Sequence, residues 1–277
     1  MRWKGSGRHV VVLAHGFGCD QHVWHRLSPH LEDQCRIVAF DHVGSGRSDM
    51  SAYTFERYRR LNGYADDLAR LLQAFEFERC TVVGHSVGAM IAMRAAIAAP
   101  EAIGRLVMLA PSPRYIDDPA TGYVGGFQPE QITELLEMME ASSGQWTRHL
   151  AGLVIDEEHA AERIEMERLF CATSPKVARD FAEATFRSDC RPLLGRCAAP
   201  SLIVGCTGDR IAPDDVTRYV ARALPSASHV QLATRGHCPH ITAPRETAEA
   251  ILAFIGRSPV HHACHRPPLL THAGRGR

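Results

Sequence analysis

The stretch Gly84-His85-Ser86-Val87-Gly88 constrains the fold of this chain more than any other. A β-branched run, Thr81-Val82-Val83, precedes it, and an alanine-rich segment from Ala89 to Ala99 follows it. This order predicts a buried strand, a sharp turn with Ser86 at its apex, and a helix. The terminal glycines let strand and helix approach closely, because they carry no side chain. The helix N-terminus would direct amide N–H groups toward whatever the Ser86 hydroxyl attacks.

Composition excludes several classes of function. The chain has 277 residues, enough for one large domain or for one domain with an insertion. Its 31 basic and 31 acidic residues balance, which argues against a nucleic-acid partner or an anionic membrane surface. We find no apolar run long enough to span a bilayer. The nine cysteines are scattered without a C-x-x-C pair, which predicts free thiols and a cytoplasmic location.

The first half of the chain alternates between predicted strands and predicted helices. Continuous apolar runs predict strands buried on both faces at His9–Ala14, Ile37–Asp41 and Leu106–Ala110. Helices are predicted over Trp24–Leu31 and over Gly63–Phe75. This alternation predicts an α/β fold, with a mostly parallel sheet and helices on both faces. Active sites in such sheets lie at the carboxyl ends of the strands.

The pattern changes after Pro111, because helical spacing alone extends from Pro129 to Phe186. Within it, Ser174-Pro175 predicts a helix start. Strand-like runs return at 201–205 and 229–232, and a closing helix is predicted over 247–255. We therefore predict a helical lid inserted between two parts of one core. The predicted limits are 1–111 and 191–257 for the core, 112–190 for the lid, and 258–277 for a disordered tail.

The serine at the turn matches G-x-S-x-G, the nucleophile elbow of α/β-hydrolases. In that fold the serine is followed along the chain by an acid and then by a histidine that takes the serine proton. Asp209 follows the predicted strand at 201–205, and His237 follows the last predicted strand in a Gly-His turn. We therefore predict that Ser86, Asp209 and His237 form a catalytic triad.

Neighbouring acids and histidines have structural interpretations. Asp214 and Asp215 are predicted to cap the helix that follows them, which leaves Asp209 as the better orienting acid. His240 is expected to be structural. His85 is expected to point away from the site and to pack in the core.

Two glycine-rich turns receive different interpretations. His15-Gly16-Phe17-Gly18 follows the first predicted strand, where an H-G-x-x turn supplies an oxyanion-hole donor. The predicted donors are the backbone amides of Phe17 and Val87. The stretch Gly44-Ser45-Gly46-Arg47-Ser48-Asp49 lacks the last glycine of a dinucleotide fingerprint and predicts only a surface turn. We expect no cofactor.

The tail after Arg257 is rich in proline, glycine, histidine and arginine. Its residues His261, His262, Cys264 and His265 are of types that chelate metals. Ligands without a folded scaffold bind weakly and unselectively, so we expect no metal site there.

Six stretches carry a family resemblance: HGFGCDQHVW, FDHVGSGRSD, GHSVGAM, APSPRYIDDP, GGFQPEQ and RGHCPHITAP. Together they resemble the RsbQ-like α/β-hydrolases over about residues 5 to 256. These are bacterial regulators of the sigma-B general stress response, in the same subfamily as the plant karrikin and strigolactone receptors. The resemblance implies a V-shaped four-helix lid over an apolar pocket, and a triad that matches the one predicted above.

The resemblance also implies a pocket and a partner. The pocket would include Phe17, Phe127, Trp146 and Phe186. The partner would be a PAS-domain serine phosphatase that activates the stress sigma-factor pathway.

Two hypotheses of function follow. In the first, the protein is a serine hydrolase of a small apolar ester or lactone-like molecule. In the second, it is a sensor whose slow hydrolysis reports a small hydrophobic ligand to the phosphatase. A stand-alone carboxylesterase without a regulatory partner is the alternative. Relatives of the dehalogenase and epoxide hydrolase type are discounted, because they use Asp as nucleophile and position 86 is Ser.

Overall fold

The computed structural model describes residues 1–77, 79–141 and 143–256. The predicted tail and its four candidate metal ligands lie outside these residues. A seven-stranded sheet forms the centre, in the order β1-β3-β2-β4-β5-β6-β7. Its strands are β1 Arg2–Lys4, β2 His9–Ala14, β3 Cys35–Ala39, β4 Cys80–His85, β5 Ile103–Leu109, β6 Ser201–Thr207 and β7 Ala227–Arg235.

Neighbouring strands are parallel except at one edge, where β1 runs antiparallel to β3. The central strands β2, β4, β5 and β6 are almost wholly buried, as their apolar runs predict. The α/β-hydrolase fold expected from the sequence is therefore confirmed. Since the strands are parallel, the residues that follow β2, β4, β6 and β7 meet at one edge of the sheet.

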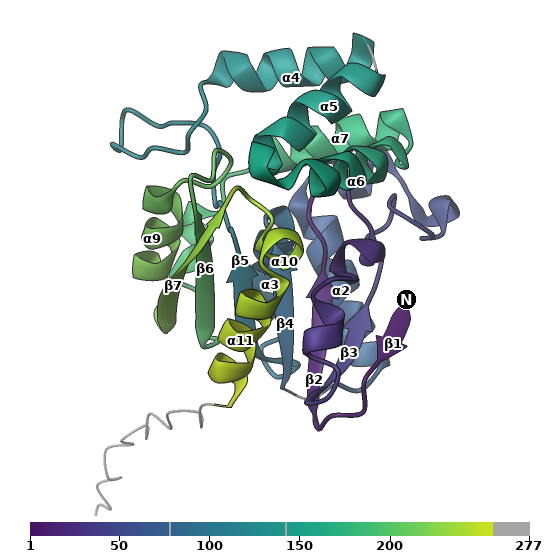
Figure 1. The fold of residues 1–277 in the computed structure, drawn as a ribbon, viewed down its shortest axis with the longest axis vertical. Helices are drawn as coiled ribbons and strands as arrows, with labels where there is room; N and C mark the ends of the chain where they lie inside the picture. The colour runs from purple at the N-terminus through teal and green to yellow at the C-terminus, as the bar shows by residue number, and fades with distance from the viewer. Residues whose placement is uncertain (78, 142, 257–277) are drawn as a thin grey trace, which may run out of the picture.

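Helices pack on both faces of this sheet (Figure 1). Between β3 and β5 lie α1 Phe55–Tyr58, α2 Leu61–Ala74 and α3 Val87–Ala98. The last part of the chain adds α8 Arg191–Leu194, α9 Asp214–Ala223, α10 Pro239–Thr242 and α11 Pro244–Ile255. Helix α2 packs against α3, while α11 packs against β7. In the described residues no helix has the length and apolar character needed to cross a membrane.

Between β5 and β6, ahead of the short α8, the described chain forms the four α-helices of the insertion: α4 Pro129–Ala141, α5 Ser143–Val154, α6 Ala160–Cys171 and α7 Pro175–Phe186. Figure 1 shows them gathered at one end of the molecule, over the edge where the parallel strands end. Helix α7 begins at Pro175 as expected, although the side chain of Ser174 makes no capping hydrogen bond. The insertion therefore covers the region in which the sequence places the catalytic residues.

One predicted helix is wrong. The segment Trp24–Leu31 contains no α-helix; instead two short 3₁₀ turns form at Gln21–Trp24 and Ser28–His30. Pro29 explains the difference, because it lacks an N–H and disfavours a helical conformation in the residue before it. The apolar spacing around Trp24 reflects burial of single side chains in the core rather than a continuous helical face.

Candidate active site

The turn after β4 holds Ser86 in a strained backbone conformation, with φ 54° and ψ −123°. Such a conformation is rare for a residue with a side chain and is typical of functional sites. The glycines on either side make it feasible. A Cβ on Gly84 would lie 2.6 Å from Cα of Ala89, and one on Gly88 would lie 2.4 Å from the carbonyl oxygen of His15. Close approach of strand, helix and the turn after β2 therefore requires glycine at both positions.

Asp209 and His237 form a buried pair. Nδ1 of His237 donates a hydrogen bond to Oδ2 of Asp209 at 2.8 Å. The other oxygen, Oδ1, accepts from the amides of Ile211 at 2.8 Å and Ala212 at 3.0 Å. The carboxylate is thus fixed by two backbone donors, and it fixes the tautomer in which Nε2 of His237 is an acceptor.

The backbone of His237 is held from two directions. Its N–H donates to the carbonyl oxygen of Val154, the last residue of α5, at 2.8 Å. Its carbonyl oxygen accepts from Nε2 of His85 at 2.9 Å. Gly236 precedes it with φ 94°, and a Cβ there would lie 3.0 Å from the Val154 carbonyl oxygen. The position of His237 therefore depends on the inserted helices as well as on the core.

Ser86 and His237 line one cavity but are not hydrogen-bonded to each other. Oγ of Ser86 lies 3.4 Å from the hydroxyl oxygen of Tyr115, which is a weak contact. Nε2 of His237 is buried and has no hydrogen-bond partner among the described residues. An unpaired buried acceptor costs free energy, so the site provides an open position for a proton donor at Nε2.

The two predicted oxyanion donors, the amides of Phe17 and Val87, lie in turns that meet beside Ser86. Val87 is the first residue of α3, where helical geometry leaves the backbone N–H unused. Phe17 follows β2 in the turn that begins at His15, and Gly88 brings this turn against the start of α3. In the described chain neither the amide of Phe17 nor that of Val87 donates a hydrogen bond to the backbone. Both amides are therefore available to a ligand beside Ser86.

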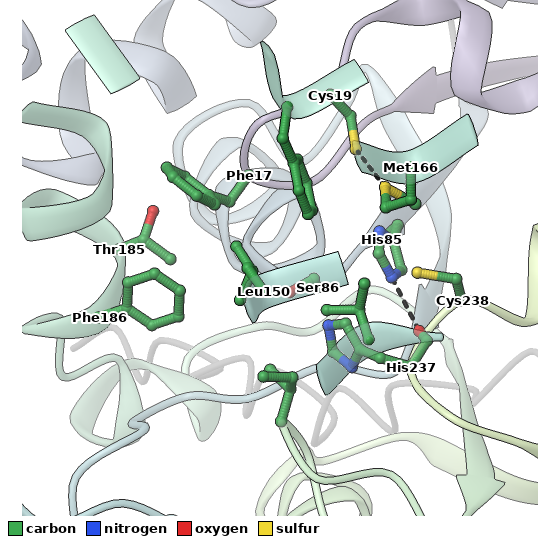
Figure 2. Close-up of a pocket in the computed structure, with 13 residues that line it drawn as sticks. Phe17, Cys19, His85, Ser86, Leu150, Met166, Thr185, Phe186, His237 and Cys238 are labelled. Carbon is green, nitrogen blue, oxygen red and sulfur yellow. Dashed lines mark hydrogen bonds between the residues drawn. The ribbon is translucent and has the colours of Figure 1, made fainter. Parts of the chain in front are cut away.

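The cavity over Ser86 is small and apolar, with a volume of about 30 Å³. Figure 2 shows Phe17 and Phe186 on one side of it and His85 and His237 on the other. Leu150 and Met166 bring α5 and α6 into its wall. Ring contacts tie the wall together, since Phe17 lies 5.5 Å from Phe186 and 5.7 Å from Phe181 between ring centroids.

The three aromatic residues predicted in the insertion take different places. Phe186 lines the cavity over Ser86. Trp146 is buried but does not line this cavity; its ring centroid lies 6.1 Å from that of Phe17. Phe127 lines a second, larger cavity of about 260 Å³ between α4 and α5. Leu150, Phe186 and Ile211 line both cavities, so they form the partition between them.

Two cysteine thiols also line the cavity over Ser86, namely Cys19 and Cys238. Burial raises the pKa of both thiols well above its ordinary value. Because the thiolate is the nucleophilic form, both thiols are inert at neutral pH. Ser86 is therefore the nucleophile that the cavity favours.

His85 differs from the expectation that it points away from the site. His85 lines the cavity, and its ring centroid lies 4.9 Å from that of His237. Its imidazole extends from the end of β4 to the turn after β7, where it bonds to the carbonyl oxygen of His237. The ring of His240 packs against that of His85, with the two centroids 4.4 Å apart. Burial lowers the pKa of His85 well below its ordinary value and that of His240 to about 3. Both rings are therefore neutral and add no charge that would oppose protonation of His237.

Tyr115 contacts Ser86 and Val154 contacts His237, two of the predicted catalytic residues, but neither carries a signal of its own in the sequence. Tyr115 lies in the loop after β5, and its stretch, APSPRYIDDP, contributed only to the family resemblance. Val154 acts through its backbone carbonyl, which no side-chain pattern reveals.

Comparison with known proteins shows the family of the chain. Residues 9–244 match the family described as alpha/beta hydrolase fold. The chain is 38% identical over 253 residues to karrikin insensitive 2 receptor CA of Petunia hybrida, covering 91% of this chain and 93% of the relative. It is 32% identical over 258 residues to strigolactone esterase D14 of Arabidopsis thaliana, covering 93% and 96%.

Solved structures add a bacterial relative. A hydrolase from Oleispira antarctica superposes with a TM-score of 0.90 and 37% identity, covering 93% of this chain and 94% of that one. The predicted fold and the likeness to karrikin and strigolactone receptors are thus confirmed. The narrower resemblance to RsbQ stays a prediction.

Proposed function

The chain belongs to the α/β-hydrolase fold family, and on this premise we propose that it is a serine esterase acting on a small apolar ester or lactone. One observation carries the proposal. His237, oriented by Asp209, presents an unpaired acceptor nitrogen in the same buried cavity as Ser86 on its strained turn. A base of this kind within reach of a serine hydroxyl is the arrangement that nucleophilic catalysis needs.

In the acylation step the Ser86 hydroxyl turns from Tyr115 toward His237 and gives its proton to Nε2. Oγ attacks the ester carbonyl carbon, and the amides of Phe17 and Val87 donate hydrogen bonds to the oxygen that becomes negative. Asp209 stabilises the imidazolium without taking its proton. When the tetrahedral intermediate collapses, the leaving alkoxide takes the proton from Nε2 and an acyl-serine remains.

Deacylation reverses these roles. A water molecule gives a proton to Nε2 of His237 and attacks the acyl carbon, and Ser86 recovers its hydroxyl proton as the carboxylic acid leaves. Since the cavity over Ser86 measures about 30 Å³, a small acyl group fits it best. The apolar walls favour an uncharged substrate.

Sensing is the second candidate, and the names of the relatives support it. A petunia relative is described as a receptor and an Arabidopsis relative as an esterase, so one fold serves both roles. The contact between His237 and Val154 supplies a physical route, because a ligand that displaces α5 would disturb the catalytic histidine.

A PAS-domain serine phosphatase as partner rests on the resemblance to RsbQ alone, as the stress-response role does. The cytoplasmic location likewise stays a prediction from the cysteine pattern. Co-purification from the native host with tagged protein tests the partner. Recovery of such a phosphatase supports regulation, and its absence favours a stand-alone carboxylesterase.

Hydrolysis of p-nitrophenyl acetate by the wild type and by Ser86→Ala tests the enzymatic proposal. We expect the variant to lose roughly 10³-fold or more in kcat, as triads do when the nucleophile is removed. Ser112→Ala is a matched control, because this buried serine follows β5 without lining the cavity. Full activity in Ser86→Ala with an intact fold would contradict the proposal.

A further inference from the structure

A second site candidate lies where the inserted helices meet the core. A surface cleft of about 410 Å³ is lined by the start of α2, by α3 and by the last turn of α7. Four arginines face it, namely Arg59, Arg60, Arg94 and Arg187. None of the four forms an ion pair within the part of the chain that the structure describes.

Neighbouring acids do not neutralise this cleft. The acidic residue in its wall, Glu183, is already paired with Arg179. Arg191, which follows the inserted helices, is by contrast neutralised, because it pairs with both Asp118 and Asp189. Four like charges around one hollow repel each other, so the cleft favours an anion that would bridge them.

Some hydrogen-bond donors in the cleft are also left unused, although Nη2 of Arg187 donates to Oγ1 of Thr133 at 3.2 Å. Nη1 of Arg94 donates to Oδ1 of Asn62 at 3.0 Å, but its Nε is buried and has no partner in the part of the chain that the structure describes. Helix α2 begins at Leu61, and the residue before it, Arg60, makes no side-chain capping hydrogen bond. The first amides of this 14-residue helix therefore have no side-chain acceptor, and the positive end of its dipole lies at the cleft.

We propose that this cleft binds the phosphate group of a small soluble molecule. Arginine forks and helix N-termini are the donors that proteins use for phosphate, since both match its charge and its several acceptor oxygens. The bound group would connect Arg60 and Asn62 of the core with Arg187 of the inserted segment. It would be separate from the catalytic cavity, because Thr185 and Phe186 line that cavity whereas Arg187 and Ser188 line the cleft.

Titration calorimetry of the full chain with inorganic pyrophosphate in a low-salt buffer tests the proposal. We expect saturable binding at one site. Loss of one charge-assisted hydrogen bond in Arg187→Gln or Arg60→Gln should raise Kd about tenfold or more. Both side chains are exposed, so neither substitution threatens the fold. Arg196→Gln is the matched control, because Arg196 is exposed elsewhere on the surface.

Two results would overturn the site. One is the absence of saturable binding at millimolar pyrophosphate, and the other is equal affinity in the cleft variants and the control. Ser86→Ala separates this proposal from the esterase, because it should bind pyrophosphate with the wild-type Kd. Weakened binding in Ser86→Ala would place the anion in the catalytic cavity and would also refute the cleft.

Discussion

The hydroxyl oxygens of Ser86 and Tyr115 lie 3.4 Å apart, while Nε2 of His237 has no hydrogen-bond partner among the described residues. The proposed nucleophile, Ser86, therefore contacts a tyrosine rather than its proposed base, His237. Rotation about a single side-chain bond of Ser86 changes its hydrogen-bond partner, and such rotations are fast compared with enzymatic turnover. Tyr115 thus competes with His237 for the serine hydroxyl in the resting protein.

This competition predicts the behaviour of Tyr115→Phe. The phenyl ring keeps the packing against Phe186, whose ring lies 5.1 Å from that of Tyr115, and only the hydroxyl is lost. We expect kcat/KM for p-nitrophenyl acetate to stay at the wild-type level or to rise. A fall of about tenfold or more, equivalent to about 1.4 kcal/mol, would instead give the Tyr115 hydroxyl a role in the transition state.

The pair of Asp209 and His237 predicts a sharp difference between two aspartates. Asp209→Asn should lower kcat by roughly 10³–10⁴-fold, because an amide favours the wrong imidazole tautomer. Asp214→Asn should stay close to the wild type. Asp214 is the first residue of α9 and accepts a hydrogen bond from Gln231 at 2.7 Å, away from the catalytic histidine. Matched esterase assays with the opposite ranking would remove Asp209 from the orienting role.

Leu150 predicts how substrate size is limited. It stands between the cavity over Ser86 and the larger cavity beside Phe127, and it lines both. Leu150→Ala should join the two spaces and shift the preference from acetyl toward hexanoyl esters, at a cost of about 2–5 kcal/mol in stability.

The control for this change is Leu135→Ala, which alters the outer cavity alone. Ratios of kcat/KM for the two esters should move in Leu150→Ala and stay unchanged in Leu135→Ala. An unchanged ratio in both variants would mean that this partition does not set acyl length.

The burial of His240 predicts that the free energy of unfolding falls in acid. It is fully buried, neither ring nitrogen has a hydrogen-bond partner within residues 1–77, 79–141 and 143–256, and burial lowers its pKa from 6.5 to about 3. The unfolded chain therefore binds a proton below pH 6.5 that the folded chain does not bind until about pH 3. Stability is fully present above pH 6.5 and is lost as the pH falls, by about 1.4 kcal/mol per pH unit for this group.

Urea unfolding at several pH values tests this account. His240→Phe keeps an aromatic ring against Trp24, which lies 4.7 Å away, but removes the titrating group. We expect a shallower loss of unfolding free energy between pH 6.5 and pH 4.5 than in the wild type. His30→Gln, at an exposed position, should leave the wild-type slope. Equal slopes in His240→Phe and the wild type would contradict the buried neutral state of His240.

Local sequence patterns predict the parallel strands of the sheet and the positions at its carboxyl edge, but not the antiparallel edge strand β1. The glycines at positions 84 and 88 predict a close approach of strand and helix. The structure has this approach, because backbone atoms lie where a Cβ would be at both positions. Asp209 and His237 were found because each follows a strand whose apolar run is plain in the sequence. Their roles stay predictions, although the structure brings them together.

Other features depend on long-range packing and could not be predicted from such patterns. Tyr115 reaches Ser86 from a loop with no regular period, and the bond from His237 to Val154 uses only backbone atoms. The expectation that His85 points away from the site is wrong. Its imidazole bonds to the carbonyl oxygen of His237 in the turn after β7, and the residues next to it in the sequence do not indicate this contact. The arginine cleft collects residues from α2, α3 and α7, which lie far apart along the chain.

The most direct test of the esterase account is the site of covalent modification. The protein is incubated with an excess of p-nitrophenyl butyrate or an alkyl fluorophosphonate, quenched in acid, and analysed by intact mass and peptide mapping. The account predicts one adduct, on Ser86, that is absent in Ser86→Ala and unaffected by Cys19→Ala or Cys238→Ala. An adduct on either cysteine, or turnover of the ester in Ser86→Ala, would contradict it.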